Sequence, residues 1–127
     1  MSRMLVRTSD QKVIAENVYF AATFWRRLRG LMFSKSFPSA YDAVLLSPCN
    51  AVHTMFMRYS IDVVFLKETG QVAAVYPFMR PWQFSAVVKN ASQVLELPAG
   101  SIERLKVTPG DYLALTERPA FPRRNIV

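Results

Sequence analysis

The chain has 127 residues, of which 51% are apolar and 13% aromatic, so it can form one core of the size usual for a single domain. Charged residues make up 20%, which argues against intrinsic disorder, and no apolar run approaches the about 20 residues of a membrane span. Sixteen Lys and Arg against nine Asp and Glu give a net charge of +7. This charge suits a polyanion as partner, but the basic residues are scattered, and general solubility is the favoured explanation.

The same totals give expectations for location and extent. The first ten residues lack the apolar stretch of a secretory signal, and a single cysteine cannot form an internal disulfide. We therefore expect a soluble, cytoplasmic protein without a membrane span. We expect one domain over residues 1–127, with its core at about 12–116 and a tail containing Pro and Arg at 117–127.

The first predicted elements are a strand or hairpin at 12–21 and an amphipathic helix at 23–33. The segment 12–21 is rich in β-branched and aromatic residues around a polar break at Glu16 and Asn17. In 23–33 apolar residues recur at helical spacing after Thr23, a residue type that caps helices.

Short strands and one further helix are predicted for the rest of the chain. The strands are predicted at 43–47, 51–57, 61–66, 71–78, 92–100 and 111–116. The turn at 68–70 predicts an antiparallel hairpin of its flanking strands, Ser101 can cap a helix at 101–107, and Thr-Pro-Gly-Asp at 108–111 predicts a type II turn. Many strands with about two short helices predict an α+β domain. Its antiparallel or mixed sheet is expected to curl toward a β-barrel, because strands that are apolar on both faces need cover on both sides.

The only cysteine and the only histidine, Cys49 and His53, lie four residues apart. In a strand they share a face but lie about 13 Å apart, too far for a thiolate–imidazolium pair unless the chain bends near Pro48. An unreactive buried thiol is the favoured interpretation of Cys49. No metal site is expected, because a structural zinc site needs four ligands of these types, and no cofactor is expected either.

Polar residues inside apolar strands are the other candidates. Asp62 interrupts the segment Ile-Asp-Val-Val-Phe-Leu, and a buried carboxylate must be paired or hydrogen-bonded. With a three-residue loop at 58–60, its nearest cation would be Arg58, either as a clamp on the loop or as an anion-binding group that Asp62 orients. Glu96 interrupts another apolar strand, and it either lies at a rim or points into a pocket.

Aromatic residues lie beside basic ones in Tyr-Pro-Phe-Met-Arg-Pro-Trp-Gln-Phe, residues 76–84. Such rings can stack on nucleic-acid bases, or they can form an apolar lid over one end of the barrel. The lid is the favoured interpretation, so nucleic acid is an alternative partner and not the expected one.

Four motifs resemble the family called domain of unknown function 192. They are "RRLRGLMF", "C-x-x-x-H-T-x-x-M-R-x-x-I-D-V-V-F-L", "V-L-E-L-P-A-G" and "G-D-Y-L-A-L", in the family's order over about residues 12–116. The resemblance implies a compact, mostly β single domain with a small helical component, and it implies no established reaction. The family's signature positions here are Gly30, Leu31, Met32, His53, Thr54, Met57, Arg58, Asp62, Phe65, Glu96, Pro98, Gly100, Gly110 and Asp111.

We therefore expect a module that binds an unknown small molecule or protein. Its predicted site consists of Arg58, Asp62 and His53, with Glu96 as a fourth member. The alternative is a small enzyme that uses His53 or Cys49, and a binding module is favoured over it because no complete catalytic set is evident. Nucleic-acid binding through the basic surface is the second alternative.

Overall fold

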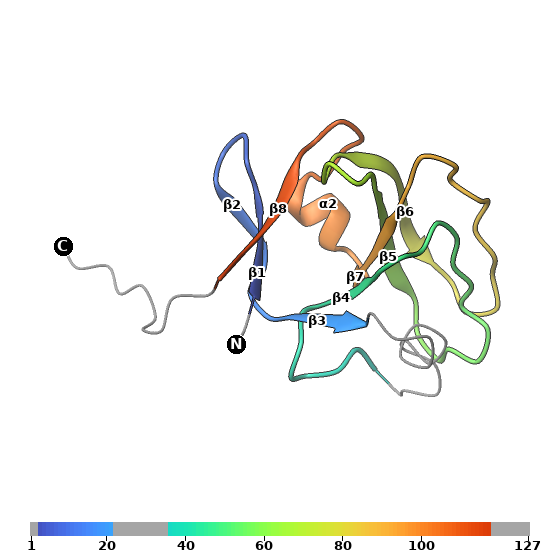
Figure 1. Ribbon diagram of the computed structural model, residues 1–127. Helices are drawn as coiled ribbons and strands as arrows, with labels where there is room; N and C mark the ends of the chain where they lie inside the picture. Colours follow the sequence, from blue (N-terminus) through green and yellow to red (C-terminus); the bar gives the residue numbers. More distant parts are fainter. Residues whose placement is uncertain (1–2, 22–35, 118–127) are drawn as a thin grey trace.

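Two β-sheets and one short helix make up the part of the chain that the computed structural model describes, residues 3–21 and 36–117 (Figure 1). In chain order the elements are β1 (Arg3–Arg7), β2 (Lys12–Ala15), β3 (Val18–Ala21), β4 (Ala43–Leu46), β5 (Ile61–Leu66), β6 (Val72–Met79), β7 (Gln93–Pro98), α2 (Ser101–Leu105) and β8 (Leu113–Glu117). One sheet has the antiparallel order β2-β1-β8. The other has the order β3-β4-β7-β5-β6 and is mixed, because β3 and β4 are parallel and its other pairs are antiparallel.

The small, mostly β domain is confirmed, whereas two details of the predicted fold are not. Neither strand order returns to its first strand, so the described strands form no closed barrel. One helix is described where about two were expected; the helix predicted at 23–33 and the tail at 118–127 lie outside the described residues. No helix in the described ranges has the length and apolar character needed to span a membrane.

Most predicted strands are confirmed. The strands β4, β5, β6, β7 and β8 lie at the predicted positions. Every residue of β5 is buried, and β6 returns antiparallel to it after the predicted turn. The segment 12–21 forms two strands that belong to different sheets, split at the predicted break. The carboxylate of Asp42 holds the chain at this crossing, since its oxygens accept the N–H groups of Glu16 and Asn17 at 2.7 Å each.

Two segments differ from the prediction. β1 was not predicted, although its Leu5 is buried in the core. The strand predicted at 51–57 is absent; within it His53 forms only an isolated bridge with Phe84. The backbone hydrogen bonds of this segment go to an irregular partner segment.

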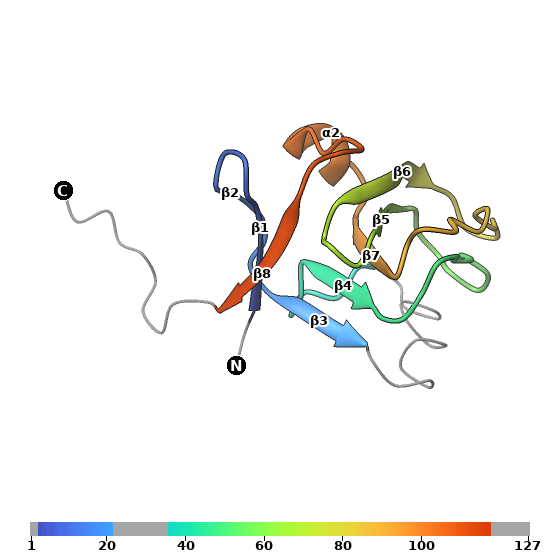
Figure 2. The ribbon, with the colours of Figure 1, turned by 45° about the horizontal axis from the view of Figure 1, so that its top comes forward.

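Two apolar clusters lie on opposite faces of the five-stranded sheet. The first lies between the two sheets and includes Val64, Leu95 and residues of α2, and Figures 1 and 2 show α2 between the two sheets. The second includes Val63 and Val94, the neighbours of those residues along the same strands. Because both faces are covered, the central strands carry apolar residues at successive positions.

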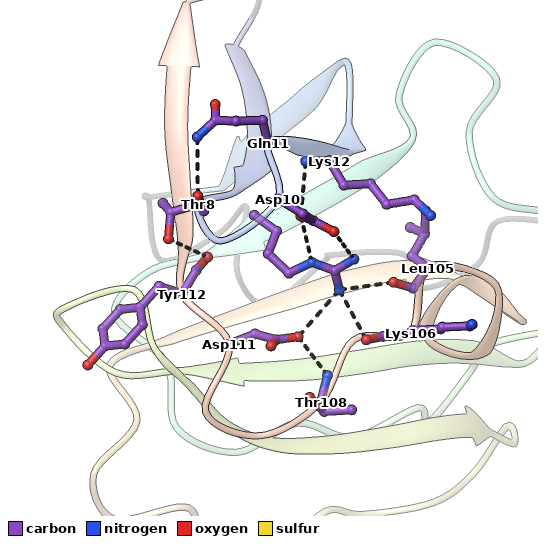
Figure 3. Close-up of polar contacts among 10 residues, drawn as sticks. Thr8, Asp10, Gln11, Lys12, Leu105, Lys106, Thr108, Asp111 and Tyr112 are labelled. Atoms are coloured by element: carbon purple, nitrogen blue, oxygen red, sulfur yellow. Dashed lines mark hydrogen bonds and ion pairs between the residues drawn. The ribbon is translucent and has the colours of Figure 1, made fainter.

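Arg7 joins the three-stranded sheet to the end of α2 through hydrogen bonds to Leu105 and Lys106, which are labelled in Figure 3. Its Nε and Nη2 each donate to a carboxylate oxygen of Asp10 at 3.0 Å, and these hydrogen bonds lower the pKa of Asp10. Its Nη1 donates to the carbonyl oxygens of Leu105 and Lys106 at 3.0 Å and to Asp111 at 3.4 Å. The last carbonyls of a helix have no partner within it, so this buried guanidinium completes α2.

Candidate functional site

Asp62 is fully buried in β5 and accepts three backbone hydrogen bonds. Its Oδ1 accepts the N–H groups of Phe78 at 2.9 Å and Gly100 at 3.2 Å, and its Oδ2 accepts that of Ile102 at 2.7 Å. Hydrogen bonds to an ionised acceptor are about twice as strong as neutral ones. Asp62 thereby ties β5 to β6 and to the start of α2.

Two local irregularities supply these N–H groups. β6 bulges at Pro77 and Phe78, which together lie opposite Asp62 on β5, and this leaves the N–H of Phe78 outside the regular ladder. Gly100 and Ile102 lie at the start of α2, where no side chain of the helix itself caps the first turn. The buried carboxylate accepts hydrogen bonds from the N–H groups of both the bulge and the helix start.

The predicted contact between Arg58 and Asp62 is not formed. No hydrogen bond or ion pair joins them in the described residues, and the Arg58 side chain is exposed. The prediction assumed that 51–57 pairs with 61–66 across a loop at 58–60. The neighbours of β5 are instead β6 and β7, so the geometry behind the predicted contact does not exist.

Asp62 and Glu96 point to opposite faces of the five-stranded sheet. In the register of β5 and β7, Asp62 lies opposite Leu97, and Glu96 lies opposite Val63. Leu97 belongs to the first apolar cluster and Val63 to the second. Paired residues share a face, so the structure does not bring the two carboxyl side chains together.

The segments 49–57 and 82–92 run side by side in opposite directions, on the side of the molecule away from the three-stranded sheet (Figures 1 and 2). Backbone hydrogen bonds join them from Cys49 and Ser92 at one end, at 2.9 Å, to Thr54 and Gln83 at the other, at 2.8 Å. We call these two segments the paired loop. Residues 82–92 supply the backbone hydrogen-bond partners of the segment 51–57.

Thr54 fixes the tip of the paired loop. It is fully buried, its hydroxyl oxygen accepts the N–H of Gln83 at 2.9 Å, and its hydroxyl donates to the carbonyl oxygen of Arg80. Its own carbonyl accepts the N–H of Trp82 at 2.9 Å. One buried threonine therefore sets the backbone position of residues 80–83.

Aromatic side chains gather on the outside of this tip. The ring centroids of Phe56 and Trp82 are 4.8 Å apart, and those of His53 and Phe84 are 6.1 Å apart. Phe56, Trp82 and Phe84 are 43%, 58% and 72% exposed. We call His53, Phe56, Trp82 and Phe84 the aromatic platform. The apolar lid predicted from residues 76–84 is not confirmed: Phe78, Trp82 and Phe84 are exposed, although Tyr76 packs against the second apolar cluster.

Three exposed aromatic residues have left-handed backbone conformations. Their φ angles are 65° at Phe56, 51° at Phe78 and 63° at Trp82. For a bulky side chain such a conformation costs about 1–3 kcal/mol. Buried polar groups hold two of them in place, since Thr54 binds the N–H of Trp82 and Asp62 binds that of Phe78.

Glu96 is a buried carboxyl group without a hydrogen-bond partner among the described residues. It lies in β7 between Val44 of β4 and Val63 of β5 and is 6% exposed, so it does not lie at a rim. Burial raises its pKa to about 7. Tyr59 reaches the same apolar cluster, and its buried hydroxyl also lacks a described partner. Burial, and secondarily the charge of Glu96, raises the pKa of Tyr59 to about 12.

The side chains of Cys49 and His53 form hydrogen bonds with nearby backbone groups and not with each other. The thiol of Cys49 donates to the carbonyl oxygen of Ala51 at 3.1 Å, and Nδ1 of His53 accepts the N–H of Met55 at 3.2 Å. No cluster of three or more His, Cys, Asp or Glu side chains in residues 3–21 and 36–117 is arranged to hold a metal ion.

A comparison with protein families identifies the chain's relatives. The model of the DUF192 family, described as Uncharacterized ACR, matches residues 4–115. The chain belongs to the DUF192 family. A UPF0127 protein of Thermococcus sibiricus is 34% identical over 125 residues, which cover 94% of this chain and 80% of that protein. UPF0127 protein PF1050 of Pyrococcus furiosus is 34% identical over 114 residues, which cover 86% of this chain and 95% of that protein.

The fold is also found in a solved structure. A protein of unknown function from Novosphingobium aromaticivorans matches with a TM-score of 0.74 at 19% identity, over 90% of this chain and 84% of that chain. At this identity the likeness shows only that the two proteins share a fold.

The DUF192 signature positions divide by structural role. Thr54 and Asp62 hold backbone groups, whereas the side chains of Arg58 and Glu96 form no hydrogen bond or ion pair with a described residue. Sequence reasoning identified Glu96 but missed Tyr59, which carried no signal beyond its place next to Arg58. It also missed the pairing of residues 53–56 with 82–84, because the two segments are far apart in the chain.

Proposed function

We propose that this DUF192 protein is a small binding module whose binding surface is the aromatic platform. The observation that carries the proposal is that the fold holds exposed aromatic residues in strained backbone conformations. Rings in solvent contribute little to stability, so the strain at Phe56 and Trp82 is not compensated by burial. Strained residues of this kind concentrate at binding sites.

The predicted site residues take different places in this proposal. His53 is part of the platform, and Arg58 follows Phe56 by two residues with an exposed side chain. Asp62 lies outside the platform: it holds the N–H of Phe78, an exposed aromatic residue that does not belong to the platform. We further propose that the module acts in the cytoplasm, because its single cysteine suits a reducing compartment.

Site-specific photo-crosslinking tests the proposal, because it captures a bound partner of any chemical class. A photo-reactive phenylalanine analogue at Phe84, the most exposed aromatic residue of the described chain, is expected to form crosslinked adducts in living cells of the host. The same analogue at Tyr112 is the matched control. Tyr112 is also an exposed aromatic residue, at 47%, but it lies beside the Arg7 contacts and not on the platform (Figure 3).

Adducts confined to position 84 support the proposed surface. Equal adducts at both positions indicate unspecific contact and contradict it, as does an absence of adducts at position 84.

A second candidate function rests on Glu96 and Tyr59. Among the described residues neither the buried carboxyl group of Glu96 nor the hydroxyl of Tyr59 has a hydrogen-bond partner, which suits a small ligand that carries both hydrogen-bond donors and acceptors. A pKa of about 7 at Glu96 suits acid–base work. The alternative of a small enzyme therefore has more support at Glu96 than at Cys49 or His53.

Thermal denaturation in the presence of acetamide, imidazole or methylguanidinium tests this second candidate. At least one probe is expected to raise the melting temperature of the unaltered protein, and Glu96→Gln and Tyr59→Phe are expected to abolish the rise. Tyr112→Phe is the matched control for loss of a phenol hydroxyl. A rise that persists in both variants excludes the site, as does the lack of any rise.

A further inference from the structure

The charged residues of the two chain segments that carry the aromatic platform are all positive. In residues 49–60 and 77–92, which hold the platform and its supports, the only Lys, Arg, Asp or Glu residues are Arg58, Arg80 and Lys89. All three are exposed. The chain as a whole carries a charge of +7, so the surface attracts polyanions.

The exposed apolar side chains of the same segments are mostly flat rings. Among the large hydrophobic side chains exposed there, Phe56, Phe78, Trp82 and Phe84 are aromatic, and Val87 is the one aliphatic member in the described chain. Helices that bind lipid surfaces combine aliphatic with aromatic side chains. Rings beside cations instead match the bases and phosphates of nucleic acid, where stacking on an aromatic side chain contributes about 1–3 kcal/mol per base.

Stacking requires bases with accessible faces. In a duplex each base is covered by its neighbours, whereas unpaired bases can be splayed onto protein rings. The platform presents its rings on two antiparallel segments, with Phe56 and Trp82 in contact at one place and His53 and Phe84 at another. Such a surface offers a flexible strand several stacking positions in a row.

We propose that the aromatic platform binds single-stranded nucleic acid, with its rings stacking on bases and Arg58, Arg80 and Lys89 contacting phosphates. This inference rests on the proposed binding function and names its partner. No strong sequence preference is expected, because every base has a face on which a ring can stack.

Trp82→Gly is the most informative variant. Glycine adopts the φ of 63° without the steric cost that tryptophan has there, so the variant is expected to fold as stably as the parent or more so. It nevertheless removes a ring of the platform. Fluorescence anisotropy with labelled oligothymidylate and oligouridylate of about 15 nucleotides, a length that spans typical single-strand sites, measures the affinity.

Loss of one stacking ring is expected to weaken binding about tenfold, both for Trp82→Gly and for Phe84→Ala. Arg58→Gln is expected to reduce the slope of log Kd against log salt concentration by about 0.7, the value for one phosphate contact on a single strand. Tyr112→Ala and Arg104→Gln are the matched controls, an exposed ring and an exposed cation away from the platform. Both are expected to bind as the parent does.

Several outcomes overturn the inference. One is the absence of oligonucleotide binding at low salt. A second is equal weakening by Arg104→Gln and Arg58→Gln with normal binding by Trp82→Gly, which indicates general attraction to a basic protein. Preference for duplex DNA of equal length, or binding only to phosphatidylglycerol vesicles, also overturns it. If oligonucleotides fail while crosslinks remain confined to position 84, the nucleic-acid inference falls and the proposed binding function stands.

Discussion

Replacing Asp62 with asparagine is expected to lower the free energy of unfolding by about 3–5 kcal/mol, a large part of the stability of a small domain. The carboxylate accepts three backbone hydrogen bonds in a fully buried position. Asparagine has one acceptor oxygen and places an NH₂ group where the protein offers further N–H donors. Each buried N–H left without a partner costs about 1–3 kcal/mol. Urea denaturation followed by circular dichroism measures the change.

Asp42→Asn is the matched control for this variant. Asp42 also accepts two backbone N–H groups, but it is half-buried, so water can replace a lost bond and the expected loss is about 1 kcal/mol. Hydrogen exchange locates the effect, because the amides of Phe78, Gly100 and Ile102 are expected to exchange faster in Asp62→Asn. A loss of stability no larger than that of Asp42→Asn would show that Asp62 does not hold β6 and α2 together.

The stability of the protein is expected to fall as the pH rises from about 4.5 to about 7, and Glu96→Gln is expected to remove this fall. Burial raises the pKa of Glu96 from 4.5 to about 7 in the folded chain. Below pH 4.5 the group is protonated in both states and has no effect. As the pH rises further, ionisation of the carboxyl group lowers the free energy of the unfolded state. The folded state has no such gain in stability until the pH passes about 7. At about 1.4 kcal/mol per pH unit, the loss totals roughly 3 kcal/mol.

The difference in unfolding free energy between Glu96→Gln and the unaltered protein isolates this effect from other titrating groups. It is expected to grow with pH across the window from 4.5 to 7 and to stay constant above it. Glu68→Gln is the control, because Glu68 is exposed on the turn between β5 and β6; its difference is expected to be flat. A flat difference for Glu96→Gln as well would mean that the carboxyl group has an ordinary pKa, and the second candidate site would lose its support.

The elements that could be predicted from the sequence are those that depend on residues close together in the chain. β5 is a continuous apolar run between polar turns, and the type II turn before β8 follows from its Pro and Gly, with Gly110 at a φ of 97°. β1 could not be predicted in the same way, because it owes its strand form to β2 on one edge and β8 on the other.

The candidate site was harder to predict than the fold, because its geometry depends on pairings between distant segments. A buried carboxylate at Asp62 was correctly expected to need partners. Those partners proved to be N–H groups of a bulge and a helix start, which only the tertiary structure provides. A strand was predicted at 51–57, but Thr54 directs that segment to 82–83 and turns its aromatic neighbours outward.

The central position of β1 in the three-stranded sheet has a consequence for the order in which the protein is made. β1 leaves the ribosome well before β8, and β2 follows β1 within a few residues, so their hairpin can form early. The other edge of β1 pairs from Arg3 opposite Glu117 to Arg7 opposite Leu113. That edge stays open in the nascent chain until β8 has emerged, and the first apolar cluster stays without part of its cover. An open strand edge above exposed apolar surface is prone to pair with other chains, so the growing polypeptide is vulnerable to such pairing until β8 has emerged.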